Sequence, residues 1–186
     1  MVVRLITILM LFNICLSIGF DPLYLNDKNR TPVERAGDLF QIAIPLSGLG
    51  YTYYSNDNIG RKQFWRTYLS SLTLTYILKY TIKKERPNGH CCESFPSGHT
   101  SAAFAGAMFI NNRYGSKVGI PAILLASFVG YSRVYAEKHY WEDVLAGALI
   151  SVISSIFYTT SINTNNENIS LFLNPLNNKI SINLKI

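Results

Sequence analysis

The amino-acid sequence predicts an all-α fold, a compact helical bundle, and three observations lead to this expectation. Hydrophobic residues make up 48% of the chain, whereas only 15% of its residues are charged. The apolar residues gather in long stretches that turn-forming residues separate, and most of these stretches are long enough for a helix. With 186 residues, the chain suffices for one domain with a core of its own.

The first part of this domain is predicted to hold two helices. Pro45 is expected to interrupt the first helix. Pro87 keeps Arg86 out of helical geometry and therefore ends the second helix before it. In order, the predicted elements are an exposed lead-in (20–33), a buried helix (37–54), a turn-rich connector (56–62) and a long helix (63–82).

Three more helices are predicted after a loop over residues 88–95. The first begins at Ser97 and carries alanines and Gly106, small residues that let a neighbouring helix approach closely. Pro121 is tolerated because it lies near the start of its helix. The three predicted elements are a helix from Ser97 that closes over residues 111–116, a helix over 117–134 and a last helix over 143–160.

The last two predicted helices are apolar enough to cross a bilayer. A helix buried inside a bundle and a membrane-spanning helix look alike at this level. The sequence leaves both readings open, and we favour a membrane-associated or partly embedded bundle over a freely soluble one.

Both ends of the chain differ from the bundle. Arg4, the apolar run over residues 5–16 and the small residues Ser17 and Gly19 resemble an export signal that is cleaved before Phe20. An uncleaved N-terminal anchor is the alternative, although the run is shorter than the roughly 20 residues of a spanning helix. The predicted domains are therefore a signal (1–19), the bundle (20–160) and a tail (161–186).

The tail shows a different periodicity. After a polar linker over residues 163–168, apolar residues alternate with others on both sides of a turn at residues 175–178. Period-2 alternation around a turn predicts a small β-hairpin. No function follows from this pattern.

Two adjacent cysteines, Cys91 and Cys92, remain if the signal is removed. Neighbouring Cα atoms lie about 3.8 Å apart, closer than disulfides usually require. We therefore expect free thiols in a loop near the active site, with an intermolecular disulfide as the alternative.

The formal net charge of +6 suits anionic partners such as phosphates or an anionic membrane surface. It does not indicate nucleic-acid binding, because the basic residues are scattered among apolar segments and no recognition motif appears.

Three short motifs carry the functional information. Together they hold three cations, a Ser-Gly turn and two histidines, one of which has a carboxylate four residues after it. The motifs are Lys79-x6-Arg86-Pro87, Pro96-Ser97-Gly98-His99 and Ser132-Arg133-x5-His139-x3-Asp143.

In order, spacing and residue types, these motifs resemble the signatures of the type 2 phosphatidic acid phosphatase (PAP2)/haloperoxidase superfamily. The resemblance covers roughly residues 37–160. It implies a helical-bundle phosphatase and allows many substrates, so it describes the chemistry better than the biology.

His139 is the expected nucleophile, since an imidazole nitrogen can hold a phosphoryl group covalently. Asp143 is expected to accept a hydrogen bond from the other ring nitrogen, provided that the last helix extends back to His139. His99 is the expected general acid and then general base. His90 belongs to no motif and is interpreted as a solvated loop residue.

The remaining motif residues are expected to bind the phosphate. Ser97 and Gly98 offer a hydroxyl and backbone donors at a helix N-terminus. Lys79, Arg86 and Arg133 would surround the phosphoryl oxygens with positive charge, so that no metal or other cofactor is needed. Lys83 and Lys84 are interpreted as solvated surface charges.

The predicted function is metal-independent hydrolysis of phosphate monoesters or pyrophosphates on the outer side of a membrane, periplasmic or membrane-associated. A phosphorylated lipid is the preferred substrate. A soluble, nonspecific acid phosphatase is an alternative enzyme, and vanadate-dependent halide oxidation is disfavoured because the resembling haloperoxidases are much larger. A non-catalytic lipid-binding or scaffold protein is the alternative outside enzymes.

Overall fold

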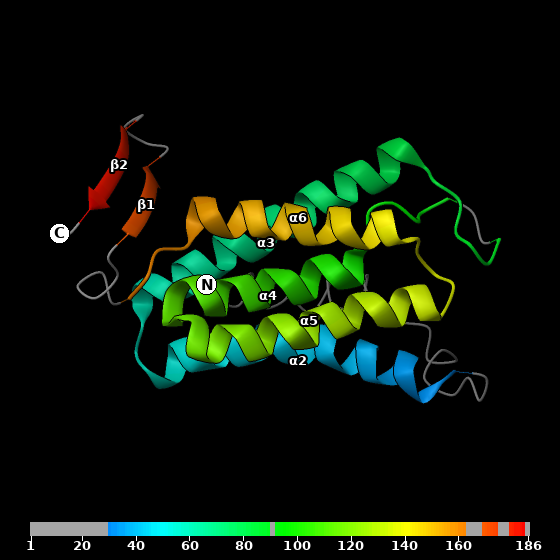
Figure 1. Cartoon of the computed structure of the whole chain (residues 1–186), viewed down its shortest axis with the longest axis horizontal. Helices are drawn as coiled ribbons and strands as arrows, with labels where there is room; N and C mark the ends of the chain where they lie inside the picture. The colour runs from blue at the N-terminus through cyan, green and yellow to red at the C-terminus, as the bar shows by residue number, and fades with distance from the viewer. Residues whose placement is uncertain (1–29, 90–91, 163–168, 175–178, 185–186) are drawn as a thin grey trace, which may run out of the picture.

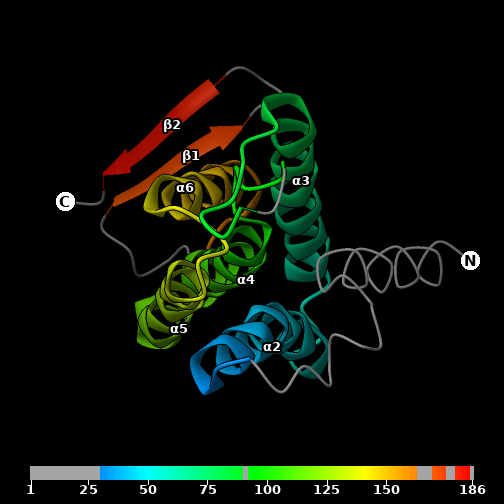
Figure 2. The ribbon, with the colours of Figure 1, turned by 90° about the vertical axis from the view of Figure 1, so that its right-hand side faces the viewer.

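The computed structural model describes residues 30–89, 92–162, 169–174 and 179–184, and its body is a helical bundle (Figure 1). Helix α4 packs against each of the other four helices, which surround it in the end-on view (Figure 2). The all-helical prediction is confirmed for this body. The helices are α2 (Pro32–Tyr54), α3 (Asn58–Ile82), α4 (Gly98–Tyr114), α5 (Ser116–Tyr135) and α6 (Trp141–Tyr158).

Small residues allow α4 to occupy the centre. A Cβ atom added to Gly106 would lie 2.6 Å from the Cα atom of Pro45, so the backbones of α2 and α4 touch here. The predicted interruption at Pro45 is wrong, because α2 runs unbroken through it. Proline fixes φ at a helical value, and the missing side chain of Gly106 leaves room for its ring.

Helices α2 and α3 each begin five residues earlier than predicted, because a capping side chain precedes each of them. Thr31 accepts a hydrogen bond from the Glu34 amide at 3.2 Å and precedes a proline at the first helical position. Asp57 likewise accepts one from the Gly60 amide at 2.8 Å. The lead-in therefore ends before Pro32, and most of the predicted connector is helix.

Polar side chains also hold the bundle together internally. A cluster of buried hydroxyl groups joins α3, α4 and α6 through Ser71, Thr75, Ser101 and Ser151, with oxygen–oxygen distances of 2.7–3.2 Å. Far from the motif residues, Arg113 binds the carboxylate of Asp57 through two nitrogens, at 2.6 and 2.7 Å. These contacts fix the helices in register with one another.

The outer surface of the bundle is unusually apolar. Helices α5 and α6 are both long and apolar enough to cross a membrane, with mean hydropathies of 1.4 and 1.3. One face of α6 exposes a stripe of large aliphatic side chains at helical spacing: Leu145, Leu149, Ile153 and Ile156.

The predicted hairpin is confirmed. Strand β1 (Ile169–Asn174) pairs antiparallel with β2 (Lys179–Leu184). The predicted signal (1–19), the linker, His90 and Cys91 lie outside the described residues. Cys92 is disulfide-bonded, so its interpretation as a free thiol is wrong.

Candidate active site

The three motifs meet at one end of the bundle, at the right of Figure 1. This end gathers the C-terminal ends of α3 and α5 and the N-terminal ends of α2, α4 and α6. Electrostatic interactions link His139 with Lys79 and Arg86, and His99 with both Arg133 and His139. The structure thus assembles residues that are scattered over more than sixty positions of the sequence.

His139 is buried in the connection between α5 and α6. Its Nδ1 atom lies 2.7 Å from the carbonyl oxygen of Ser94. A carbonyl can only accept a hydrogen bond, so Nδ1 carries the proton and Nε2 keeps its lone pair. Burial lowers the pKa of His139; Asp143 opposes this shift, whereas Lys79 and Arg86 add to it. The imidazole is therefore kept neutral.

Asp143 does not make the expected hydrogen bond to His139. Its Oδ2 atom lies 3.8 Å from Nδ1, because α6 begins at Trp141 and does not extend back to the histidine. Instead, Oδ2 accepts hydrogen bonds from the Ser94 hydroxyl at 2.5 Å and the Tyr140 amide at 3.0 Å. Asp143 thus places Ser94, which in turn holds His139.

Lys84 is not a solvated surface charge, and that interpretation is wrong. Its Nζ atom lies 2.8 Å from Oδ1 of Asp143 and 2.7 Å from Oε1 of Glu142. It also lies 4.3 Å from the ring centre of Tyr140. Burial alone would lower the pKa of Lys84, but hydrogen bonds to the two carboxylates outweigh it and raise the pKa.

Ser97 and Gly98 form the start of α4, as predicted. Ser97 caps the helix, its Oγ accepting from the Thr100 hydroxyl at 2.9 Å, and its amide donates to the Asp143 carbonyl at 2.9 Å. Gly98 is buried, yet apart from its chain neighbours and the backbone of its own helix no atom of the described residues lies within 4 Å of where its Cβ would be. This space adjoins the free amides of a helix N-terminus, which attract anions.

The two cations of the first motif, Lys79 and Arg86, have few hydrogen-bond partners among the described residues. Lys79 is buried, and its Nζ donates to the Glu93 carbonyl at 2.5 Å. The buried Nε of Arg86 has no hydrogen-bond partner within the described structure. Buried donors are normally paired, so this N–H group is suited to an anionic ligand.

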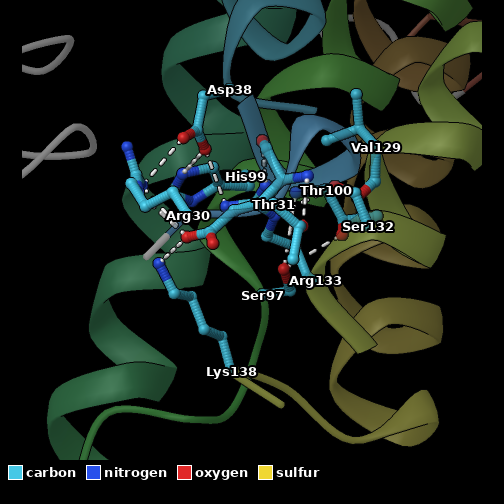
Figure 3. Close-up of polar contacts among 11 residues, drawn as sticks. Arg30, Thr31, Asp38, Ser97, His99, Thr100, Val129, Ser132, Arg133 and Lys138 are labelled. Carbon is cyan, nitrogen blue, oxygen red and sulfur yellow. Dashed lines mark hydrogen bonds and ion pairs between the residues drawn. The ribbon is translucent and has the colours of Figure 1, made fainter. Parts of the chain in front are cut away.

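Arg133 is held by acceptors of α2, which the motifs do not include (Figure 3). Its NH1 donates to Asp38 Oδ1 at 2.7 Å and its NH2 to the Glu34 carbonyl at 2.8 Å. The same Asp38 oxygen lies 3.3 Å from Nε2 of His99. The sequence interpretation missed Asp38 and Glu34, and Ser94 as well.

Among the described residues, no group of three or more His, Cys, Asp and Glu side chains could hold a metal ion. The expectation that cationic side chains neutralise the phosphate remains a prediction.

Comparison with known proteins agrees with the motifs. Residues 64–167 match the model of the PAP2 superfamily. The lipid A 1-phosphatase of Porphyromonas gingivalis is 32% identical over 134 residues, which are 66% of this chain and 29% of that protein. Lipid phosphate phosphatase 2 of Arabidopsis thaliana is 32% identical over 123 residues, 54% of this chain and 42% of that protein. The chain thus spans less than half the length of either relative.

A solved structure supports the fold. The crystal structure of Aquifex aeolicus LpxE superposes with a TM-score of 0.60 and is 23% identical, covering 78% of this chain and 92% of that one.

Proposed function

The chain belongs to the PAP2 superfamily, and we propose that it hydrolyses the phosphate monoester or terminal pyrophosphate of a membrane lipid through a phosphohistidine, without a metal. One observation carries this proposal. The buried His139 holds its Nδ1 proton on the Ser94 carbonyl at 2.7 Å, which leaves Nε2 free, and Lys79, Arg86 and His99 lie near enough to interact with it electrostatically. Nucleophile, proton donor and anion-binding groups are thus present together.

In the first step, the Nε2 lone pair of His139 attacks phosphorus, and the bond between phosphorus and the leaving oxygen breaks. His99, in its protonated form, gives its proton to that oxygen. The Ser94 carbonyl keeps the Nδ1 proton of His139 in place, and the nearby charge of Asp143 stabilises the cationic ring that results.

In the second step, water attacks the phosphohistidine. His99 takes a proton from this water, the nitrogen–phosphorus bond breaks, and inorganic phosphate leaves. His139 returns to its neutral form and His99 to its protonated form. Lys79, Arg86 and Arg133 offset the negative charge on the phosphoryl oxygens throughout.

The outer surface of the bundle supports a lipid substrate. Soluble proteins rarely expose large contiguous apolar patches, whereas the α6 stripe is exposed along the length of its helix. At the catalytic end the exposed side chains become aromatic, as is usual at membrane–water interfaces: Tyr80, Tyr135, Tyr140 and Trp141. We propose that this end lies at the level of the lipid headgroups.

We propose further that this end faces the outside of the cytoplasmic membrane, with residues 1–19 acting as export signal or anchor. The basic and apolar N-terminal sequence supports this orientation. Digestion of intact spheroplasts and of lysed cells with a protease measures it. Protection of the chain in intact spheroplasts would contradict the outward orientation.

The test measures phosphate release by the full chain in detergent micelles, in the presence of a metal chelator. Phosphatidic acid is compared with p-nitrophenyl phosphate, a small soluble ester. His139→Ala should abolish turnover, whereas His90→Ala, which changes the only histidine outside the motifs, should retain it. Acid-labile labelling of the wild-type protein by a radioactive phosphate substrate should disappear in His139→Ala.

The outcomes separate the alternatives. A clear preference for the lipid supports the proposal, and equal or faster turnover of the soluble ester favours a nonspecific acid phosphatase. A folded protein that hydrolyses neither substrate contradicts the proposal and favours the scaffold.

A further inference from the structure

Asp38 lies outside the segment that matches the family model, yet it contacts two motif residues. Its Oδ1 atom is 3.3 Å from Nε2 of His99 and 2.7 Å from NH1 of Arg133 (Figure 3). The matched segment begins at residue 64, so α2 and its carboxylates precede it.

The backbone of α2 is held closely against α5 at this point. A Cβ atom added to Gly37 would lie 1.9 Å from Oγ of Ser132 and 2.8 Å from NH2 of Arg133. No side chain other than the hydrogen of glycine fits this contact. Asp38, the next residue, therefore has its Cα fixed relative to the phosphate-binding arginine.

Charged neighbours then fix the carboxylate of Asp38 itself. Arg30 lies 2.8 Å from its Oδ2 atom and 3.1 Å from Oε1 of Glu34. The two carboxylates of α2 thus share Arg30, and each has a second cation of its own: Lys138 pairs with Glu34 and Arg133 with Asp38. Asp38 is the one that contacts the histidine.

We propose that Asp38 is a positioning residue for His99: it accepts a hydrogen bond from Nε2–H, orients the ring, and favours its protonated form, from which Nδ1–H is given to the leaving oxygen. The inference rests on the proposed function. Asp38 forms no bond to the substrate and loses no proton. It acts through the histidine, as a carboxylate commonly orients a catalytic imidazole.

Leaving-group dependence distinguishes this role from a merely structural one. An alkoxide leaves poorly without a proton, whereas p-nitrophenolate leaves well without one. Asp38→Asn should therefore slow the hydrolysis of short-chain phosphatidic acid by about 10²-fold, within the usual range for general acids, and that of p-nitrophenyl phosphate much less. Glu85→Gln removes one carboxylate charge at an exposed position and should leave both rates unchanged.

The pH profile gives a second readout. Within the described part of the chain, the charged or titratable groups that act on His99 are Asp38 from α2, Arg133 from α5 and His139 from the α5–α6 connection. Loss of the Asp38 carboxylate removes the only negative charge among them. The basic limb of kcat/KM should consequently move to lower pH in Asp38→Asn, while the acidic limb remains in place.

A double-mutant cycle tests whether Asp38 acts through His99. In a His99→Ala background, Asp38→Asn should cause little further loss; fully additive losses would overturn the inference. An unchanged rate ratio between the two esters in a folded Asp38→Asn variant would overturn it as well. If Asp38→Asn does not fold, the same ratio is measured in Asp38→Glu, where the charge is displaced by one methylene group, and an unchanged ratio there has the same meaning.

This design separates the inference from the proposed function. A wild-type chain that hydrolyses neither ester contradicts both, whereas active wild type with an insensitive Asp38 contradicts the inference alone.

Discussion

The site contains two histidine–carboxylate pairs, and they are built in opposite ways. His139 and Asp143 are four positions apart in the sequence, yet 3.8 Å separates Nδ1 of His139 from Oδ2 of Asp143, and Ser94 mediates between them. His99 and Asp38 come from different helices and lie 3.3 Å apart. The spacing of a histidine and a carboxylate in the sequence therefore does not tell whether the two side chains are in direct contact.

The difference also concerns what each carboxylate does for its histidine. The carboxylate of Asp143 accepts hydrogen bonds from Lys84, Ser94 and the Tyr140 amide, and it thereby positions the loop that holds His139. Asp38 shares one oxygen between His99 and Arg133, so it couples the expected proton donor to an expected phosphate ligand. The first pair leaves the ring neutral. In the second pair, burial lowers the pKa of His99 to about 3, and the carboxylate of Asp38 opposes that shift.

The largest expected effect comes from replacing the histidine of each pair. His139→Ala should reduce phosphate release by about 10⁴-fold or more, as loss of a covalent nucleophile does. His99→Ala should cost about 10²–10⁴-fold, because only acid–base assistance is lost. Steady-state rates on the lipid and trapping of the phosphoenzyme measure both. Phosphoenzyme that persists in His139→Ala would reverse the assigned roles.

Gly37→Ala should disturb the His99–Asp38 pair without removing a charged group. The added methyl group would collide with Ser132 and push α2 away from Arg133 and His99. We expect a loss of about 1–3 kcal/mol of unfolding free energy from overpacking, and slower lipid hydrolysis. Gly50→Ala is the matched control in the same helix: it meets no atom of the described structure within 4 Å, and it should stabilise by about 0.5–1 kcal/mol. Equal melting temperatures for the two variants would refute the close contact.

Lys84→Met tests the support of the first pair. Without its ion pair the Asp143 carboxylate should hold Ser94 less firmly, and we expect turnover to fall about tenfold, at the low end of measured losses for groups that orient a ligand. Lys83→Met changes a neighbouring exposed lysine and should have no effect. Similar rates for the two variants would show that Lys84 behaves as a solvated surface charge and does not support the site.

The smallest expected effect is a shift in pH dependence. Because the pKa of His139 is lowered, the nucleophile should stay neutral below the ordinary histidine value of about 6.5. The acidic limb of kcat/KM should therefore lie below that pH. Lys84→Met removes a positive charge beside Asp143. Its removal stabilises the imidazolium form of His139, so the acidic limb should move to higher pH. Comparing the two proteins on one substrate cancels the ionisation of the substrate itself; a shift to lower pH would contradict the assignment.

The sequence predicted those features whose signals are local. Helix α4 and its cap were visible at Ser97, and the three motifs supported a family resemblance that the comparison confirms. The assigned roles of the motif residues stay predictions. The hairpin was visible from its alternation.

The missed residues depend on contacts between distant segments. Nothing in the sequence around Lys84 indicates a role in the site, because its ion-pair partners, Glu142 and Asp143, lie on α6, far away along the chain. Asp38 was hidden by a wrong helix boundary: with the helix starting at Gly37, that glycine looked like a terminus. Because the helix starts at Pro32, Gly37 lies inside it, and a glycine inside a helix often marks close packing.

The buried hydroxyl cluster of Ser71, Thr75, Ser101 and Ser151 has a consequence for the medium in which the chain works. Helices in lipid gain nothing from expelling water, and they associate through close packing of small residues and hydrogen bonds between helices. A bundle fastened by hydroxyl groups at its centre keeps its internal alignment whether water or hydrocarbon surrounds it. The chain can therefore expose its outer surface to lipid, as the proposed substrate would require, while the geometry of the end that carries the three motifs stays the same.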